Sequence, residues 1–228
     1  MTVPPPPLSV VIPALNEADH LDDLLDALMP LRRRGCEVIL VDGGSRDGTV
    51  ARAGDRVDRV LTSPRGRALQ MNAGAAEARA GVLWFLHADC RIPDDADALI
   101  QTGLADRGWG RFDVRLSGSH PLLRVVESLM NIRSCLTGIA TGDQGLFMRT
   151  EIFRAAGGFA EIPLMEDIDL SRRLKRAAGR PACLRHRVVT SSRRWEQRGI
   201  LRTIVLMWCL RGAYALGVSP SRLARWYR

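Results

Sequence analysis

The sequence predicts an α/β fold in which a mainly parallel central sheet is flanked by helices. Short apolar, β-branched stretches typical of buried strands alternate with segments whose apolar residues recur at helical spacing. This alternation indicates right-handed βαβ units, which form a parallel sheet covered on both faces. Binding sites in such sheets lie beyond the carboxyl ends of the strands, so the residues that follow each strand are candidates for function.

The first half of the chain contains four expected strands. Each is a short run dominated by Val, Ile and Leu. The first helical segment carries leucines at helical spacing, and its acids lie at its start, where the helix dipole favours them. In chain order the expected elements are the strand 8–15, the helix 16–31, the strand 36–44, the helix 49–53, the strand 56–63, the helix 66–80 and the strand 81–89.

The second half is less regular. An apolar stripe at helical spacing predicts a helix over 120–136, and residues 141–153 predict a loop that leads into a buried segment. Residues 163–179 begin with acids and end with bases, as the helix dipole favours. Residues 199–217 predict a mostly apolar helix or helix pair.

Length and composition favour one domain with a small appendage. The chain has 228 residues, and 46% of them are hydrophobic, an ordinary share for a globular core. The apolar run Ile204–Leu210 is far shorter than the roughly 20 residues of a membrane span. Met1–Pro7 has no feature of a secretory signal. Five scattered cysteines without a CxxC pair argue against a disulfide framework or a structural zinc site, and they favour a cytoplasmic location.

The net charge of +8 is unevenly distributed along the chain. Residues 172–228 contain fifteen basic residues and one acid, Glu196, whereas the preceding residues contain 18 basic and 24 acidic residues. Such a basic segment suits nucleic acid, an anionic membrane surface or a phosphorylated substrate. Without an aromatic–basic motif we expect no nucleic-acid partner. The C-terminal helices are expected to pack on the sheet; peripheral contact with the inner face of the membrane and a homodimer interface are the alternatives.

Polar residues follow the first two expected strands. Asn16 and Glu17 come after the first strand, and Asp42 ends the second, directly before two glycines. A carboxylate there can accept hydrogen bonds from a nucleobase or a ribose hydroxyl, and the glycines let a ligand approach the backbone. A simple turn explains Asp42 equally well, because Asp-Gly and Gly-Gly are common turn formers.

The fourth expected strand finishes on His87-Ala88-Asp89, at the same edge of the predicted sheet. Strand alternation turns His87 and Asp89 to one side and Ala88 to the other. A carboxylate at this position can anchor Mg²⁺ or Mn²⁺ beside a bound diphosphate. Helix capping is the structural alternative for Asp89, and a satisfied polar contact is the alternative for His87.

The segment "MEDIDLSRRLK" has three acids in four residues, Glu166, Asp167 and Asp169. Acids at a helix start are stabilised by the helix dipole, and they can pair with Arg172 or Arg173 one turn later. One carboxylate that points into the cleft could instead take a proton from an attacking hydroxyl. Composition does not choose between these two explanations.

Three residues are candidates for contact with a sugar. Asp143 and Gln144 lie in "GDQGLF", which also suits a plain turn. Trp195 could stack on a sugar ring or could be a core tryptophan.

A basic stretch, "HRVVTSSRRW", precedes the C-terminal helices. Arg193 and Arg194 could neutralise a diphosphate leaving group, and His186 is a further candidate metal ligand. An exposed basic loop is the structural alternative.

In order and spacing, these motifs resemble a family 2 glycosyltransferase of GT-A fold. The matching segments, spread over residues 8–195, are "SVVIPALNE", "VDGGSRDGT", "GRALQMNAGAA", "FLHADC" and "MEDIDLSRRLK". The resemblance implies a GT-A domain over 8–195 with a helical extension over 196–228 packed on it. "HADC", "GDQ" and "SSRRWE" resemble a small bacterial subgroup described as arsenosugar-biosynthesis or radical-SAM/selenodomain-associated transferases.

The resemblance also implies a role for individual residues. Asp42 matches the residue that holds the base, Asp89 the metal-binding aspartate, and Asp167 the catalytic base, next to Glu166. The residues that match the segments lining the nucleotide are Pro13, Ala14, Asn16, Glu17, Arg67, Gln70 and Asn72, with His87 and Ala88 in the metal motif.

The chain departs from the family pattern at three positions. Cys90, directly after Asp89, stands where another aspartate is common. His87 stands where an aspartate usually leads the metal motif, and imidazole suits Mn²⁺ better than Mg²⁺. Ser191 stands where processive members have a glutamine, so we do not expect a polymerase. We expect an inverting, metal-dependent transfer from a UDP- or GDP-sugar to a small-molecule or lipid-linked acceptor. The alternatives are a nucleotidyltransferase and a non-catalytic nucleotide-sugar-binding module.

Overall fold

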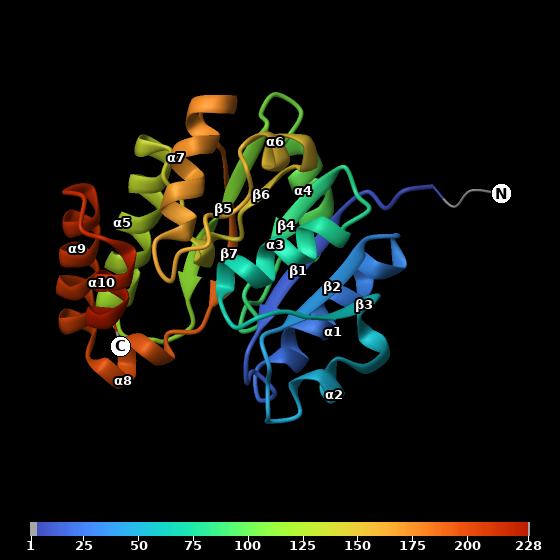
Figure 1. Ribbon diagram of the computed structural model, residues 1–228, viewed down its shortest axis with the longest axis horizontal. Coiled ribbons are helices and arrows are strands. Elements are labelled where there is room, and N and C mark those ends of the chain that lie inside the picture. The colour runs from blue at the N-terminus through green and yellow to red at the C-terminus, as the bar shows by residue number, and fades with distance from the viewer. Residues whose placement is uncertain (1–3, 228) are drawn as a thin grey trace.

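A seven-stranded sheet forms the centre of the computed structural model, which describes residues 4–227 (Figure 1). Along the sheet the strand order is β3-β2-β1-β4-β6-β5-β7, and β6 alone runs antiparallel to its neighbours, β4 and β5. The strands are β1 (Ser9–Ala14), β2 (Glu37–Asp42), β3 (Arg59–Thr62), β4 (Val82–Phe85), β5 (Trp109–Leu116), β6 (Phe147–Arg149) and β7 (Ala182–Thr190). The expected, mainly parallel α/β fold is therefore confirmed.

Helices cover both faces of this sheet (Figure 1). Those bounding the core are α1 (Leu21–Arg33), α2 (Thr49–Ala53), α3 (Arg67–Glu77), α4 (Ala96–Gly103), α6 (Thr150–Ala155) and α7 (Glu166–Ala178). The others are α5 (Pro121–Thr137), α8 (Arg193–Arg198), α9 (Ile200–Ala215) and α10 (Pro220–Tyr227), with short 3₁₀ turns η1 (Gly54–Arg56) and η2 (Gly142–Gln144). No helix was expected at α4, and α6 begins inside the segment 141–153, where a loop leading into a buried segment was expected. α8 begins inside the basic stretch 186–195, for which no helix was expected.

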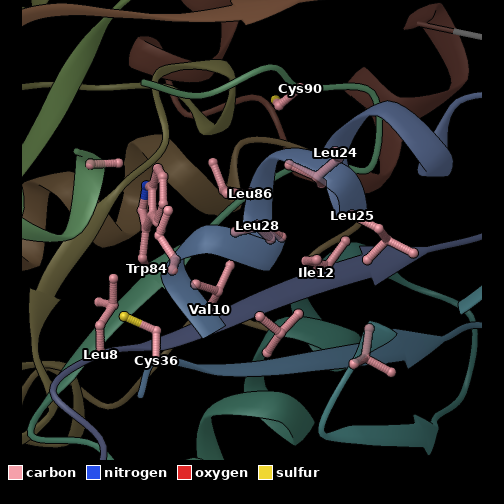
Figure 2. Packing of buried hydrophobic residues seen from close by; sticks show 14 of the residues in the cluster. Leu8, Val10, Ile12, Leu24, Leu25, Leu28, Cys36, Trp84, Leu86 and Cys90 are labelled. Carbon is pink, nitrogen blue, oxygen red and sulfur yellow. The ribbon is translucent and has the colours of Figure 1, made fainter. Parts of the chain in front are cut away.

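The core has two layers because successive side chains of each buried strand point to opposite faces. Val10 and Ile12 of β1 pack against the leucines of α1, such as Leu24 and Leu28 (Figure 2). Val11, between them, belongs to the cluster on the other face, which contains apolar residues of α3, α6 and α7. Burial on both faces explains why the strands are continuous apolar runs.

The structure corrects the expected end of the fourth strand. β4 ends at Phe85, and a turn follows in which the Cys90 backbone N–H donates to the His87 carbonyl oxygen. The alternation that would place His87 and Asp89 on one face therefore does not apply, although Ala88 is buried in the core. β5 was not expected, because Arg111 and Asp113 interrupt its apolar pattern.

The structure also corrects the expectation that the cysteines are unpaired. Cys135 on α5 and Cys183 on β7 form a disulfide with a Cα–Cα distance of 5.9 Å. Cys36, Cys90 and Cys209 are free. The two cysteines are 48 positions apart, so no local spacing motif predicts that they pair. The cysteine pattern therefore no longer supports a reducing compartment.

The C-terminal helices pack on the start of α7. Leu210 of α9 and Leu223 of α10 are buried in a cluster with Met165 and Ile168. α8 spans the expected boundary between residues 195 and 196, so the division of the chain there stays a prediction. Within residues 4–227 no helix is both long and apolar enough to cross a membrane. The first three residues of Met1–Pro7, where no secretory signal is expected, lie outside the described residues.

Candidate active site

Three strand ends meet at one edge of the sheet. β1 pairs in parallel with both β2 and β4, so the segments that leave their carboxyl ends lie side by side. Pro13 and Ala14 end β1, Asp42 ends β2, and the turn with His87 and Asp89 follows β4. This is the edge at which parallel α/β sheets place their ligands.

The loops after β1 and β2 are joined to each other. Asn16 has a left-handed backbone with a φ of 55°; its backbone N–H donates to Ser45 Oγ at 2.9 Å. Its side-chain oxygen accepts from the backbone N–H of Arg46, also at 2.9 Å. The backbone N–H of Glu17 donates to Thr49 Oγ1. Asn16 therefore holds two loops in register, which explains why an amide is useful at this strained position.

The carboxylate of Asp42 is used within its own turn. It accepts hydrogen bonds from the backbone N–H groups of Gly44 at 2.9 Å and Ser45 at 3.0 Å, and Asp42 is 5% exposed. These contacts are those of the turn that the sequence offers as the alternative to base binding. The role of Asp42 in holding a base stays a prediction.

Two predicted donor-binding residues on α3 make contacts within the fold. Gln70 is buried, and its amide donates to the carbonyl oxygens of Ala14 at 2.7 Å and Val41 at 2.8 Å. Asn72 exchanges two hydrogen bonds with the backbone of Phe159. Both residues thus position loops at the site edge, and their role in donor binding stays a prediction.

Acids and bases from distant parts of the chain converge at the start of α7. Glu166 is 4% exposed and lies 3.3 Å from the Arg67 guanidinium, measured from Oε1 to Nη1. A pocket is lined by Arg67, Met71, Phe85, His87, Gly142, Leu146, Phe159, Glu166 and Asp167. We call this the Asp167 pocket.

Asp167 is held by two backbone N–H donors. Gly142 donates to Oδ2 at 2.9 Å, and Ile168 donates to Oδ1 at 2.7 Å. Burial, followed by the adjacent Glu166 charge, raises the pKa of Asp167 to about 6, against the opposing effect of these donors and of Arg67. A carboxyl group with a pKa near neutrality can accept a proton under physiological conditions, which a general base requires.

His87 and Asp143 line the same region. His87 Nδ1 lies 3.3 Å from Asp143 Oδ1. Burial raises the pKa of Asp143, but the His87 hydrogen bond and the charges of His87, Arg67 and Arg194 outweigh it, so the pKa is lowered. A β-carbon added to Gly142 would lie 2.8 Å from His87 Nε2, so only glycine fits between the imidazole and the Asp167 carboxylate. Sequence reasoning missed Gly142, since its signal was only a glycine in a turn-like segment.

A pair of carboxylates lies beside His87. Burial and the nearby Asp89 charge raise the pKa of Glu17, while Arg193, His20 and His87 oppose the increase. The Oε2 atom of Glu17 is buried and has no hydrogen-bond partner among residues 4–227. In that part of the chain no three His, Cys, Asp or Glu side chains form a ready metal cluster.

Of the predicted sugar contacts, Gln144 is buried and Trp195 is half-buried. Gln144 is fully buried, and its amide donates to Ser134 Oγ at 2.9 Å. Trp195 packs in an apolar cluster with Leu123 and Val126 of α5. The structure therefore favours the turn and core explanations for these two side chains.

Of the basic residues before the C-terminal helices, the two arginines of α8 lie near the site, whereas His186 does not line the Asp167 pocket. Arg193 contacts the His20 ring, and the Arg194 guanidinium lies 4.6 Å from the Tyr227 ring centroid. Both arginines also interact electrostatically with carboxylates of the site. Arg193 interacts with Glu17, and Arg194 interacts with Asp143. His186 is exposed on β7 and does not line the Asp167 pocket.

Two further arginines approach Asp167 from the helical side. Burial and the Arg211 charge lower the pKa of Arg133 to about 10, and burial also lowers the pKa of Arg211. Both interact favourably with the Asp167 charge, yet neither forms an ion pair within the described part of the chain. Arg133 donates to the Ile139 carbonyl oxygen at 3.2 Å.

Comparison with known proteins identifies relatives of this chain. Residues 9–107 match the family model described as glycosyl transferase family 2. The chain is 31% identical over 194 residues to the succinoglycan biosynthesis protein ExoA of Rhizobium meliloti, an alignment covering 75% of the chain and 58% of that protein. It is 32% identical over 162 residues to an undecaprenyl-phosphate 4-deoxy-4-formamido-L-arabinose transferase of Pseudomonas fluorescens, covering 62% and 46%. The chain thus spans about half the length of these relatives.

Solved structures share the fold. A mannosyltransferase of Pyrobaculum calidifontis, in complex with GDP-Man and Mn²⁺, superposes with a TM-score of 0.67 at 19% identity, over 98% of this chain and 69% of that one. Glucosyl-3-phosphoglycerate synthase of Mycobacterium tuberculosis, in complex with Mn²⁺, UDP and its product, gives 0.60 at 19% identity, over 80% and 70%. The chain has the GT-A fold of these glycosyltransferases.

Proposed function

We propose that this glycosyltransferase, whose residues 9–107 match family 2, uses a nucleotide-diphosphate sugar as its donor. The sugar is transferred to an acceptor hydroxyl with inversion at the anomeric carbon. The observation that carries this proposal is the half-buried Asp167 carboxylate, held by two backbone N–H donors, whose pKa of about 6 suits a general base. It faces a pocket that also contains Arg67 and Glu166.

In the proposed reaction, Asp167 takes the proton of the acceptor hydroxyl as its oxygen attacks C1 of the donor sugar. The bond between C1 and the diphosphate oxygen breaks on the opposite side, which inverts the anomeric centre. Gly142 and Ile168 hold the carboxylate by its two oxygens, so its orientation is set before the substrate arrives. The Arg67–Glu166 ion pair keeps the second acid in place beside it.

The leaving diphosphate needs positive charge. Arg193 and Arg194 can supply it, because both begin α8 and both interact with acids of the site. Loss of one such charge typically costs about 3 kcal/mol of transition-state stabilisation.

A divalent cation, Mn²⁺ or Mg²⁺, fits beside Asp89. Glu17, with its unpartnered oxygen, is the second oxygen donor, and phosphate oxygens of the donor would complete the coordination. The cation would offset the diphosphate charge. His87 stays a candidate ligand, because its Nδ1 faces Asp143 but its buried Nε2 has no hydrogen-bond partner among residues 4–227. His186 lies elsewhere, on β7.

A UDP- or GDP-sugar is the proposed donor, supported by the UDP and GDP-Man found in structures of the same fold. Thermal unfolding with UDP-, GDP-, CDP- and dTDP-sugars, each with and without Mn²⁺, tests this choice. We expect one nucleotide to raise the unfolding temperature, and more so with Mn²⁺. Release of a nucleoside diphosphate supports transfer, whereas release of pyrophosphate would indicate a nucleotidyltransferase. Tight binding without hydrolysis or transfer would indicate a binding module. The arsenosugar-associated subgroup stays a prediction.

The acceptor is proposed to carry an anionic group. Arg133 and Arg211 lie beside Asp167 without an acidic partner, and a phosphate there would satisfy two guanidinium groups that otherwise repel each other. Both a phosphorylated small molecule and a lipid phosphate meet this requirement. Inorganic phosphate should raise the unfolding temperature of the wild type and not that of the Arg133→Gln, Arg211→Gln double variant. An equal rise in both proteins would contradict the assignment.

The expected cytoplasmic location and homodimer stay predictions.

A further inference from the structure

Two neighbouring helices expose apolar side chains in regular stripes. The exposed residues recur every three or four positions, so each stripe follows one side of its helix. On α5 they are Val125, Leu129, Ile132 and Leu136, at 52–67% exposure, and on α9 they are Leu201, Val205 and Trp208, at 60–69%. We call these residues the outer face. Contiguous exposed apolar surfaces of this kind mark sites of interaction.

Both stripes point away from the core of the protein. α5 and α9 lie side by side, with α9 outermost (Figure 1), and they pack through Leu123 and Val126 against Ile204. The helices run in the same direction, because these contacts join their first halves while Arg133 and Arg211 are neighbours further along. At 3.6 residues per turn, the α5 stripe lies opposite the buried Leu123 and Ser134. The α9 stripe lies opposite the buried Thr203 and Leu210.

The charge on the helices around the outer face is mostly positive, although the exposed Glu196 of α8 lines a hollow together with Leu201 and Arg202. α9 and α10 contain no acid, and the single acid of α5, Glu127, is 5% exposed and bonded to the backbone N–H of Leu116. The exposed arginines are Arg202, Arg222 and Arg225, and Trp226 is 51% exposed between them and the end of α10. Tryptophan and arginine are the side chains that lie at the boundary between lipid and water.

We propose that the outer face docks on an anionic membrane surface. Leu, Ile, Val and Trp would enter the headgroup region, and the arginines would contact lipid phosphates. A second copy of the chain fits this face less well than a membrane does. A dimer would bring the positively charged helices α9 and α10 of two copies together, and they would repel each other. α9 packs on the protein without this face, because it buries Leu210 and Thr203 on its inner side.

Docking would bring the acceptor side of the Asp167 pocket close to the lipid surface. α9 contacts Met165 and Ile168, the residues on either side of Glu166 and Asp167. A lipid-linked acceptor with a phosphate could then reach Arg211 without leaving the membrane. This consequence rests on the proposed transfer function, whereas docking itself does not.

Vesicle sedimentation tests the docking without any substrate. The full chain is mixed with vesicles of phosphatidylcholine alone or of equal parts phosphatidylcholine and phosphatidylglycerol. We expect binding to the anionic vesicles, a marked loss at high salt, and weak binding to the neutral ones. The Val205→Ser, Trp208→Ser variant of α9 and the Leu129→Ser, Ile132→Ser variant of α5 should each bind roughly tenfold more weakly.

Val60→Ser is the matched control. Val60 is also exposed, at 40%, but it lies on β3, far along the sheet from α5. This variant should bind vesicles as the wild type does, and circular dichroism should show all variants folded. Absence of binding by the folded wild type would overturn the proposal. So would a dimer that light scattering detects in the wild type and that the α9 variant abolishes. Because no donor is present, failure of docking leaves the transfer reaction open to its own test.

Discussion

Asp167→Asn separates the catalytic role of Asp167 from its role in the fold. Asparagine has nearly the same shape, but its amide cannot accept the acceptor proton, so transfer should fall about 10²–10⁴-fold. With a pKa of about 6, the wild-type carboxylate is ionised in roughly one-tenth of molecules at pH 5 and roughly nine-tenths at pH 7. The wild-type kcat/KM should therefore rise about ninefold between these pH values, and the residual activity of the variant should lack this rise.

The same substitution should stabilise the protein near neutral pH. The folded-state pKa of Asp167, about 6, exceeds the unfolded value of 3.8, so the folded protein binds the proton more tightly. Its contribution to stability is then present at low pH and is lost as the pH rises from about 4 to about 6. A shift of roughly two units corresponds to at most about 3 kcal/mol. Asparagine avoids this loss, but its NH₂ group cannot accept one of the two backbone hydrogen bonds. The lost bond offsets the gain in stability by about 1 kcal/mol.

Three measurements test this reasoning on the same variant. Calorimetry of the donor complex should give wild-type affinity, because the carboxylate is assigned to the acceptor hydroxyl. Thermal unfolding at pH 4 and pH 7 should show that the wild type loses more stability than Asp167→Asn over this range. The assignment is wrong if donor affinity falls as much as activity does, since Asp167 would then hold the donor or its cation. It is also wrong if the wild-type pH profile is flat from pH 5 to pH 7.

Three further substitutions test the local packing. Gly142→Ala places a methyl group against the His87 ring and should lower transfer about tenfold or more, with donor binding measured by calorimetry as the comparison. Cys135→Ser should lower the free energy of unfolding by as much as about 4 kcal/mol, given a loop of 48 residues, and a reductant should have the same effect on the wild type and none on the variant. Gly74→Ala adds a methyl group that overlaps a valine of β1, so urea unfolding should show a loss of about 1–3 kcal/mol; an unchanged midpoint would mean that α3 does not pack so closely on the sheet.

Local patterns predicted the first half of the fold well. Buried strands between two helical layers must be continuous apolar runs, and β1, β2 and β4 have this signature. The sequence did not predict β5, because a buried arginine is unusual in a strand. Arg111 is neutralised there by Asp113, and this ion pair exists only once the strand has formed. The sequence also did not predict the Cys135–Cys183 disulfide, because α5 and β7 come together only in the folded chain.

The sequence by itself determined the class of fold, the edge of the sheet where a ligand is expected, and the acids at the start of α7. These depend on periodicity and on order along the chain, which are local properties. Only the tertiary structure decided how the candidates divide. It turned Gln70, Asn72 and Gln144 inward as hydrogen-bond partners of the backbone or of α5, and it raised the pKa of Asp167 by burying it beside Glu166. Burial and charge at one atom depend on segments far apart in the chain, and the folded structure alone brings those segments together.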